Sequence, residues 1–107
     1  MAKVIWTEPA LADLGRIFDF LATSTASADT AERICEDLLE KTYSRLGVLP
    51  DSGALVYELR DYGAREIYVH AYRIIYVHEG DACYIRQCVH SSRDLIQHID
   101  PEHWNDL

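Results

Sequence analysis

The sequence contains no long hydrophobic run. None of its apolar stretches approaches the roughly 20 residues that a membrane-spanning helix requires. The apolar part of the N-terminal segment Met1–Glu8 is also too short for the hydrophobic region of a signal peptide. We therefore expect a cytoplasmic protein. With 107 residues, of which 49% are hydrophobic, the chain is expected to form one domain over residues 1–107.

Positive charge is also scarce. The chain has 10 Lys and Arg against 18 Asp and Glu, which gives a formal net charge of −8, and no lysine follows Lys41. Proteins that bind DNA or RNA through phosphates normally carry a basic surplus, because their cations replace condensed counterions. Any nucleic-acid contact would therefore need a local basic cluster. A protein partner with basic segments is the easier expectation.

Cysteine and glycine are few and scattered. The three cysteines, Cys35, Cys83 and Cys88, form no CxxC pair, which argues against a disulfide framework and fits a reducing compartment. Cys88 and His90 alone are not a zinc ligand set, because such sites normally show two closely spaced ligand pairs. The glycines form no nucleotide-binding loop. We expect neither a metal nor a cofactor.

A short strand at Lys3–Trp6 and two helical patterns open the chain. Thr7 is a suitable N-cap for the first helix, which should end near Thr23–Thr25, where side chains compete for backbone hydrogen bonds. Ser27 is a plausible N-cap for the second helix, with Gly47 just past its end. Apolar side chains recur at helical spacing at Leu11, Leu14, Ile17, Phe18 and Leu21, and at Ala31, Ile34, Cys35, Leu38, Leu39, Thr42 and Leu46. The short connection predicts an antiparallel hairpin whose apolar side covers another surface.

The second half of the chain is typical of strands. Val48–Gly53 should be a loop, and Leu55–Leu59 is expected to be extended. Runs rich in β-branched and aromatic residues follow at Arg65–Val69, Tyr72–Val77 and Ala82–Val89. The short gaps at His70–Ala71 and Glu79–Asp81 predict hairpin turns, and hence an antiparallel meander. Ser92–Ile99 is expected to form a short helix.

Strand periodicity predicts which side chains share a face. The Arg73 side chain should point to one face of the sheet, and its sequence neighbours Tyr72 and Ile74 should point to the other face. On the last strand, strict alternation predicts that one face carries Tyr84, Arg86, Cys88 and His90, and that the other face carries Cys83, Ile85, Gln87 and Val89. The pairing register does not follow from the pattern, so whether Arg73 approaches His90 stays open.

This order of elements, with the Leu-Pro…Gly loop and "GAREIYVHAYRIIYVHEGDACYIRQCVHSSRD", resembles the RelE/ParE superfamily of toxins from bacterial type II toxin–antitoxin systems. The most specific parts are Arg65-Glu66, the strand Tyr72–Tyr76 and the segment Val89–Asp94. The expected fold is α+β. It has an N-terminal strand, an antiparallel helical hairpin packed on a three- to four-stranded, mainly antiparallel sheet, and a short C-terminal helix.

The resemblance implies one of two activities. RelE-like members are ribosome-dependent endoribonucleases that cleave mRNA. On that branch Arg73 would stabilise the phosphate, His90 would act as a general acid, and Arg65 would be a third candidate. The catalytic set is incomplete here, because Ser91 stands where an aromatic residue often follows the histidine. The commonplace alternatives are that Arg73 pairs with Glu66 and that His90 hydrogen bonds to backbone.

ParE-like members are non-enzymatic poisons of DNA gyrase. The acidic charge, the length of chain beyond His90 and the "VHSSRDL" ending favour this branch. We therefore expect a toxin of the plasmid-stabilisation type that binds gyrase. An mRNA endoribonuclease is the alternative, and a diverged, non-toxic member that retains antitoxin binding is the second alternative. Whether the chain is an enzyme stays open.

The resemblance also implies an antitoxin whose C-terminal segment wraps the toxin through helix-in-groove and strand-addition contacts. The receiving surfaces should be the outer side of the Leu11–Leu46 hairpin and the exposed sheet face with an edge strand. The candidate contact residues are Leu14, Phe18, Leu38, Tyr72 and Ile74. A homodimer or a toxin–antitoxin heterotetramer is expected, and the isolated chain should be poorly soluble or self-associated.

Overall fold

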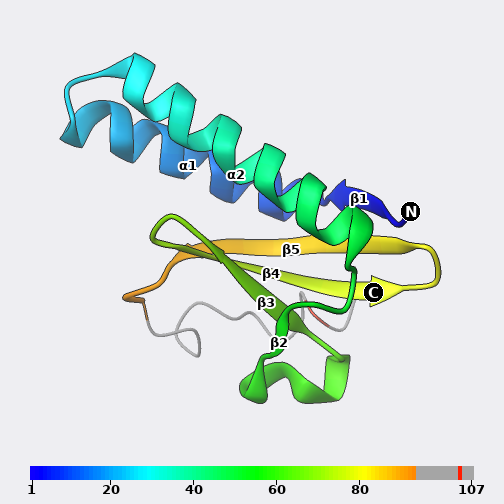
Figure 1. Ribbon diagram of the computed structural model, residues 1–107. Helices are drawn as coiled ribbons and strands as arrows, with labels where there is room; N and C mark the ends of the chain where they lie inside the picture. The colour runs from blue at the N-terminus through cyan, green and yellow to red at the C-terminus, as the bar shows by residue number, and fades with distance from the viewer. Residues whose placement is uncertain (94–103, 105–107) are drawn as a thin grey trace.

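The computed structural model describes residues 1–93 and Trp104, and it shows a helical hairpin lying on one face of a mixed sheet (Figure 1). The elements are β1 (Lys3–Trp6), α1 (Glu8–Ser24), α2 (Ala28–Val48), β2 (Ala54–Leu55), the 3₁₀-helix η1 (Tyr57–Tyr62), β3 (Arg65–Val69), β4 (Tyr72–Glu79) and β5 (Ala82–His90). The strand order is β1-β5-β4-β3-β2. The predicted α+β architecture is confirmed, although the sheet that the described residues form has five strands, because β1 and β2 both join it. No helix among the described residues is long and apolar enough to cross a membrane.

The two helices begin and end close to the predicted positions. The Ser27 hydroxyl caps α2 by accepting from the Thr30 N–H at 3.1 Å. Thr7 occupies the N-cap position of α1, but its hydroxyl donates to the Ile85 carbonyl at 2.6 Å and thereby ties the helix start to β5. The prediction that Gly47 follows the second helix is wrong. The helix continues to Val48, and the next amide still donates to the Arg45 carbonyl.

The expected extended segment Leu55–Leu59 is only partly a strand. Leu55 pairs with Arg65 in β2, and Tyr57–Tyr62 then form η1. Val56 and Leu59 are both buried, three residues apart. A 3₁₀-helix places such residues on one side, whereas a strand would point them to opposite faces. The predicted helix at Ser92–Ile99 lies outside the described residues from position 94 onward.

The antiparallel meander β3–β4–β5 is confirmed, but it contains a β-bulge that the pattern did not reveal. Ile75 of β4 is opposite Gln87, and the next residue, Tyr76, is opposite Ile85. Arg86 is therefore an extra residue in β5. One extra residue reverses the alternation of side chains beyond it.

The bulge overturns the predicted grouping on the last strand. Cys88 belongs to the same core cluster as Cys83 and Ile85, which the alternation had assigned to the other face. Beyond the bulge His90 is opposite Tyr72, and Arg73 is opposite Val89. Because Tyr72 and Arg73 are neighbours in a strand, their side chains point to opposite faces.

Each face of the sheet has its own core. The helices and the strand side chains that face them form the larger one, with Val4, Ala10, Ile17, Cys35, Leu38, Leu46, Ile67, Val69, Tyr72, Ile74, Tyr76, Cys83, Ile85 and Cys88. On the other face η1 and Trp104 cover the strands, with Val56, Leu59, Ala64, Ile75 and Val77. The Arg86 guanidinium lies 4.5 Å from the centroid of the Trp104 ring. The sheet face opposite the helices is therefore partly covered rather than open.

All three cysteines are buried and unpaired in the helix-side core. Burial raises the pKa of the Cys35 and Cys83 thiols, and it raises the pKa of Cys88 to about 12. The thiolate is the reactive form of cysteine. At pH 8 only about one Cys88 in ten thousand would be ionised, against roughly a quarter of exposed cysteines with an ordinary pKa.

We expect the native chain to resist iodoacetamide at pH 8, whereas the chain unfolded in guanidinium should take up three labels. Mass spectrometry of the quenched reactions counts the labels. Alkylation of native Cys88 at the rate found for the unfolded chain would contradict the burial described here.

Candidate functional site

Arg73 is held in a largely buried ion pair on the face of the sheet that carries η1. Its Nε donates to Glu66 Oε2 at 2.8 Å, and its Nη2 contacts the same oxygen. The two side chains are only 14% and 12% exposed. Glu66 Oε1 accepts a further bond from the Tyr68 hydroxyl at 3.2 Å. The guanidinium is thus already bound to a carboxylate within the sheet.

Arg65 holds the loop that joins α2 to β2. Its Nη1 donates to the Gly53 carbonyl at 2.9 Å, and its Nε lies 3.9 Å from Asp51 Oδ1. Arg45 reaches the same loop from α2, where its Nη2 donates to the Ser52 carbonyl at 3.0 Å. Through these contacts Arg65, which pairs with Tyr76 across β3 and β4, stabilises the loop between α2 and β2.

His90 ends β5 with one ring nitrogen already bonded. The Ser92 N–H donates to Nδ1 at 3.1 Å, and the Ser92 hydroxyl lies 2.7 Å from the same atom. Because a backbone N–H can only donate, the neutral ring must carry its proton on Nε2. The ring also stands edge-on to Tyr72, with centroids 5.5 Å apart.

The three residues predicted for a ribonuclease site are therefore not brought together. Arg73 lies opposite Tyr68 and Val89, on the face away from the helices. His90 lies on the helix side, beside Tyr72, and Arg65 is the first residue of β3, where it pairs with Tyr76.

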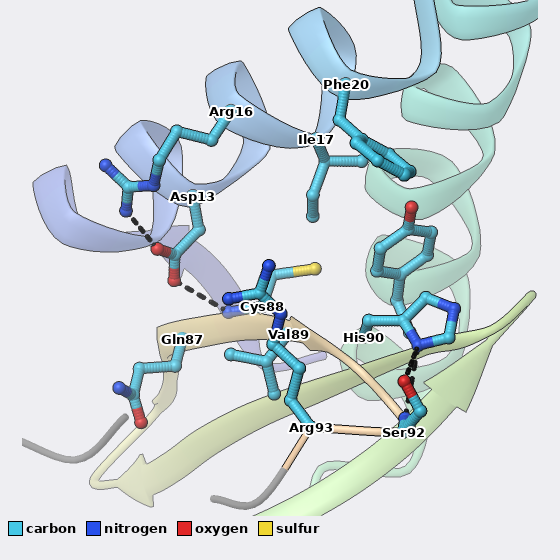
Figure 2. Close-up of a pocket in the computed structure, with 11 residues that line it drawn as sticks. Asp13, Arg16, Ile17, Phe20, Gln87, Cys88, Val89, His90, Ser92 and Arg93 are labelled. Carbon is cyan, nitrogen blue, oxygen red and sulfur yellow. Dashed lines mark hydrogen bonds and ion pairs between the residues drawn. The ribbon is translucent and has the colours of Figure 1, made fainter. Parts of the chain in front are cut away.

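A pocket with a volume of about 500 Å³ does form around His90, between α1 and the end of β5 (Figure 2). Asp13 of α1 fixes one wall, since its Oδ2 accepts from the Cys88 N–H at 3.0 Å and its Oδ1 pairs with Arg16. Arg93 lines the pocket from the segment after β5. The sequence pattern did not identify this group of residues, although the Asp13–Arg16 spacing and the arginine after the last strand were visible signals.

The predicted antitoxin contacts are mostly core residues. Leu38 and Ile74 are 0% exposed and Tyr72 is 6% exposed, while Leu14 and Phe18 are partly buried against the same core. Contact between Leu38 or Ile74 and a partner would require the helices to leave the sheet. The large apolar side chains that are exposed are Met1, Ile5, Leu11, Phe20, Tyr43, Val48, Leu49, Leu55, Tyr57 and Tyr68.

Comparisons with known proteins agree with this architecture. Residues 4–95 match the family model described as the ParE toxin of the type II toxin–antitoxin system parDE. A solved structure, the chromosomal ParDE toxin–antitoxin system from P. aeruginosa, is similar with a TM-score of 0.69 and 20% identity. That match covers 84% of this chain and 96% of the other, and at this identity it shows the fold alone. No protein with a curated description matches. Because the family model covers most of the sequence, this chain belongs to the ParE toxin family of type II toxin–antitoxin systems.

Proposed function

We propose that this chain is a toxin that acts by binding DNA gyrase and not by cutting RNA. The observation that carries the proposal is the separation of Arg73 from His90 by the thickness of the sheet. An RNA-cleaving site needs a cation and a proton-transferring group that reach the same phosphate. Arg73 is bound to Glu66 on one face, and His90 lies on the other. This arrangement supports a binding function.

The proposal includes a cognate antitoxin that covers exposed apolar surface. Leu11 and Phe20 of α1 and Tyr43 of α2 are exposed, as expected for helices that meet a partner. The strand order also leaves part of a sheet edge available for pairing with another strand. β2 pairs only with Arg65 and Glu66, so Ile67–Val69 have no outer strand among the described residues. An extended antitoxin segment could pair there.

The same proposal places the chain in the cytoplasm, where gyrase and nascent antitoxin are found, as one domain. In the inactive state we expect a toxin–antitoxin heterotetramer, and for the free toxin a homodimer or larger self-associated species. Exposed apolar side chains without their partner favour such self-association.

Supercoiling of relaxed plasmid by purified gyrase tests the function. We expect the purified chain to abolish supercoiling or to trap cleaved DNA, and an equimolar amount of the small protein encoded beside it to restore supercoiling. A parallel reaction with translating ribosomes should leave mRNA intact. Undiminished supercoiling together with site-specific mRNA cuts by the folded chain would reverse the proposal in favour of the ribonuclease alternative.

A further inference from the structure

We propose that the pocket between α1 and the end of β5 binds a small organic anion that carries an aromatic ring. Its anionic group would contact Arg93, and its ring would lie against Phe20. The pocket shares Phe20 with the apolar surface proposed for the antitoxin, but the inference does not depend on that proposal, because it is tested on the free chain.

The pocket has a surplus of positive charge in an acidic protein. Its charged lining residues are Asp13, Arg16 and Arg93, so two cations face one carboxylate, and the chain as a whole has a net charge of −8. Asp13 is already paired with Arg16. The ion pairs formed among the described residues do not include Arg93. A guanidinium that has no carboxylate partner among the described residues and lies in a concave site favours a carboxylate or a phosphate.

Figure 2 shows the Arg93 side chain extending from the segment after β5 across Val89 toward Cys88 and α1, while the His90 ring lies on the other side of the pocket. The bonds from Ser92 to His90 Nδ1 leave the proton of the neutral ring on Nε2, which makes that atom a donor. The polar part of the pocket therefore offers mainly donors, and an oxyanion such as a phosphate or a carboxylate would accept from the Arg93 guanidinium.

The other side of the pocket is apolar and suits a ring. Phe20 is 64% exposed, which leaves most of a large apolar face in water, and Ile17 and Tyr72 are buried behind it. Aromatic rings gain from offset or edge-on contact as well as from burial. A pocket of about 500 Å³ lies within the usual range for small-molecule sites and has room for more than an inorganic anion.

Isothermal titration of the full chain with three probes separates the two contributions. Phenyl phosphate carries both parts, inorganic phosphate lacks the ring, and phenol lacks the charge. We expect phenyl phosphate to bind about tenfold or more tightly than either fragment, because each part contributes its own contacts.

Variants then assign the contacts. Arg93→Gln should weaken phenyl phosphate about tenfold or more, since a charge-assisted pair is lost. Phe20→Ala should weaken phenyl phosphate but leave inorganic phosphate unchanged. Arg33→Gln is the matched control, because Arg33 is an exposed residue of α2 that does not line the pocket, and it should bind as the unaltered chain does.

Three results would overturn the proposal. The first is no binding of phenyl phosphate at millimolar concentration by the folded chain. The second is equal affinity of phenol and phenyl phosphate, which would mean that no anion is recognised. The third is an equal loss of affinity for phenyl phosphate in the Arg93→Gln and Arg33→Gln variants, which would mean that only the net charge of the chain matters.

Discussion

Replacing Gly53 by alanine is expected to lower the free energy of unfolding by about 3 kcal/mol, the upper end of what overpacking costs. A Cβ at this position would lie 2.7 Å from the Glu66 carbonyl oxygen, 2.7 Å from the Tyr76 hydroxyl and 2.8 Å from Tyr76 Cε1. All three distances are too short for carbon, so one of the neighbours must move.

Neither neighbour can move freely. Glu66 belongs to β3, and its position is fixed by pairing with Ala54 and Ile75. Tyr76 is fully buried, and its hydroxyl donates to the Pro50 carbonyl at 2.8 Å while it accepts from the Gly53 N–H at 3.0 Å. Displacing the ring would break both bonds and would disturb the helix-side core.

Denaturant unfolding of Gly53→Ala and Gly15→Ala measures this effect with an internal control. Gly15 lies inside α1 with nothing near its added carbon, so alanine there should stabilise the chain by about 1 kcal/mol through helix propensity. The same substitution should thus act in opposite directions at the two sites. A Gly53→Ala variant as stable as the unaltered chain would show that the loop does not pack against Tyr76 as described.

Replacing Arg73 alone by methionine should cost about 3 kcal/mol, because it leaves the Glu66 carboxylate largely buried without its cation. The paired change Arg73→Met with Glu66→Gln should recover most of that loss, since no charge then remains in the site. Arg16→Met is the control. That arginine pairs with Asp13 but is 70% exposed, so its loss should change stability by no more than about 0.5 kcal/mol.

Thermal and denaturant unfolding of the three variants would check this ranking. If Arg73→Met and Arg16→Met lower the free energy of unfolding by the same small amount, the Arg73–Glu66 pair is a surface contact. Its guanidinium would then be free to bind a phosphate. The ribonuclease alternative would then regain its phosphate-binding residue.

The elements that could be predicted from the sequence are those with a repeating local pattern. The helical hairpin and the meander follow from apolar spacing, and the Ser27 cap and the end of α1 near Thr25 follow from local side-chain bonds. The parallel pairing of β1 with β5 could not be predicted, because it depends on where the hairpin returns the chain. The bulge at Arg86 is a single inserted residue, and alternation alone cannot locate it.

In the candidate site, too, contacts between nearby strands could be predicted, whereas contacts that depend on tertiary packing could not. The pairing of Arg73 with Glu66 was open to prediction, since the two residues lie on facing strands of one hairpin. The pocket was not, because Asp13 and Cys88 are 75 positions apart and meet only through the packing of α1 on β5. The predicted grouping of His90 with Tyr84 and Arg86 was wrong because of the bulge, and a joint role of His90 with Arg73 had stayed open because the strand register was not predictable.

The most direct test of the central claim is growth arrest by a variant that lacks the supposed catalytic groups but keeps the fold. The changes Arg73→Met, Glu66→Gln and His90→Ala, combined in one chain, remove the guanidinium and the imidazole without leaving a buried charge. Growth is measured on induction in bacterial cells, with far-ultraviolet circular dichroism of the purified variant as the check on folding. Arrest equal to that of the unaltered chain is the predicted result. A folded variant that no longer arrests growth would contradict a toxin that acts by binding alone.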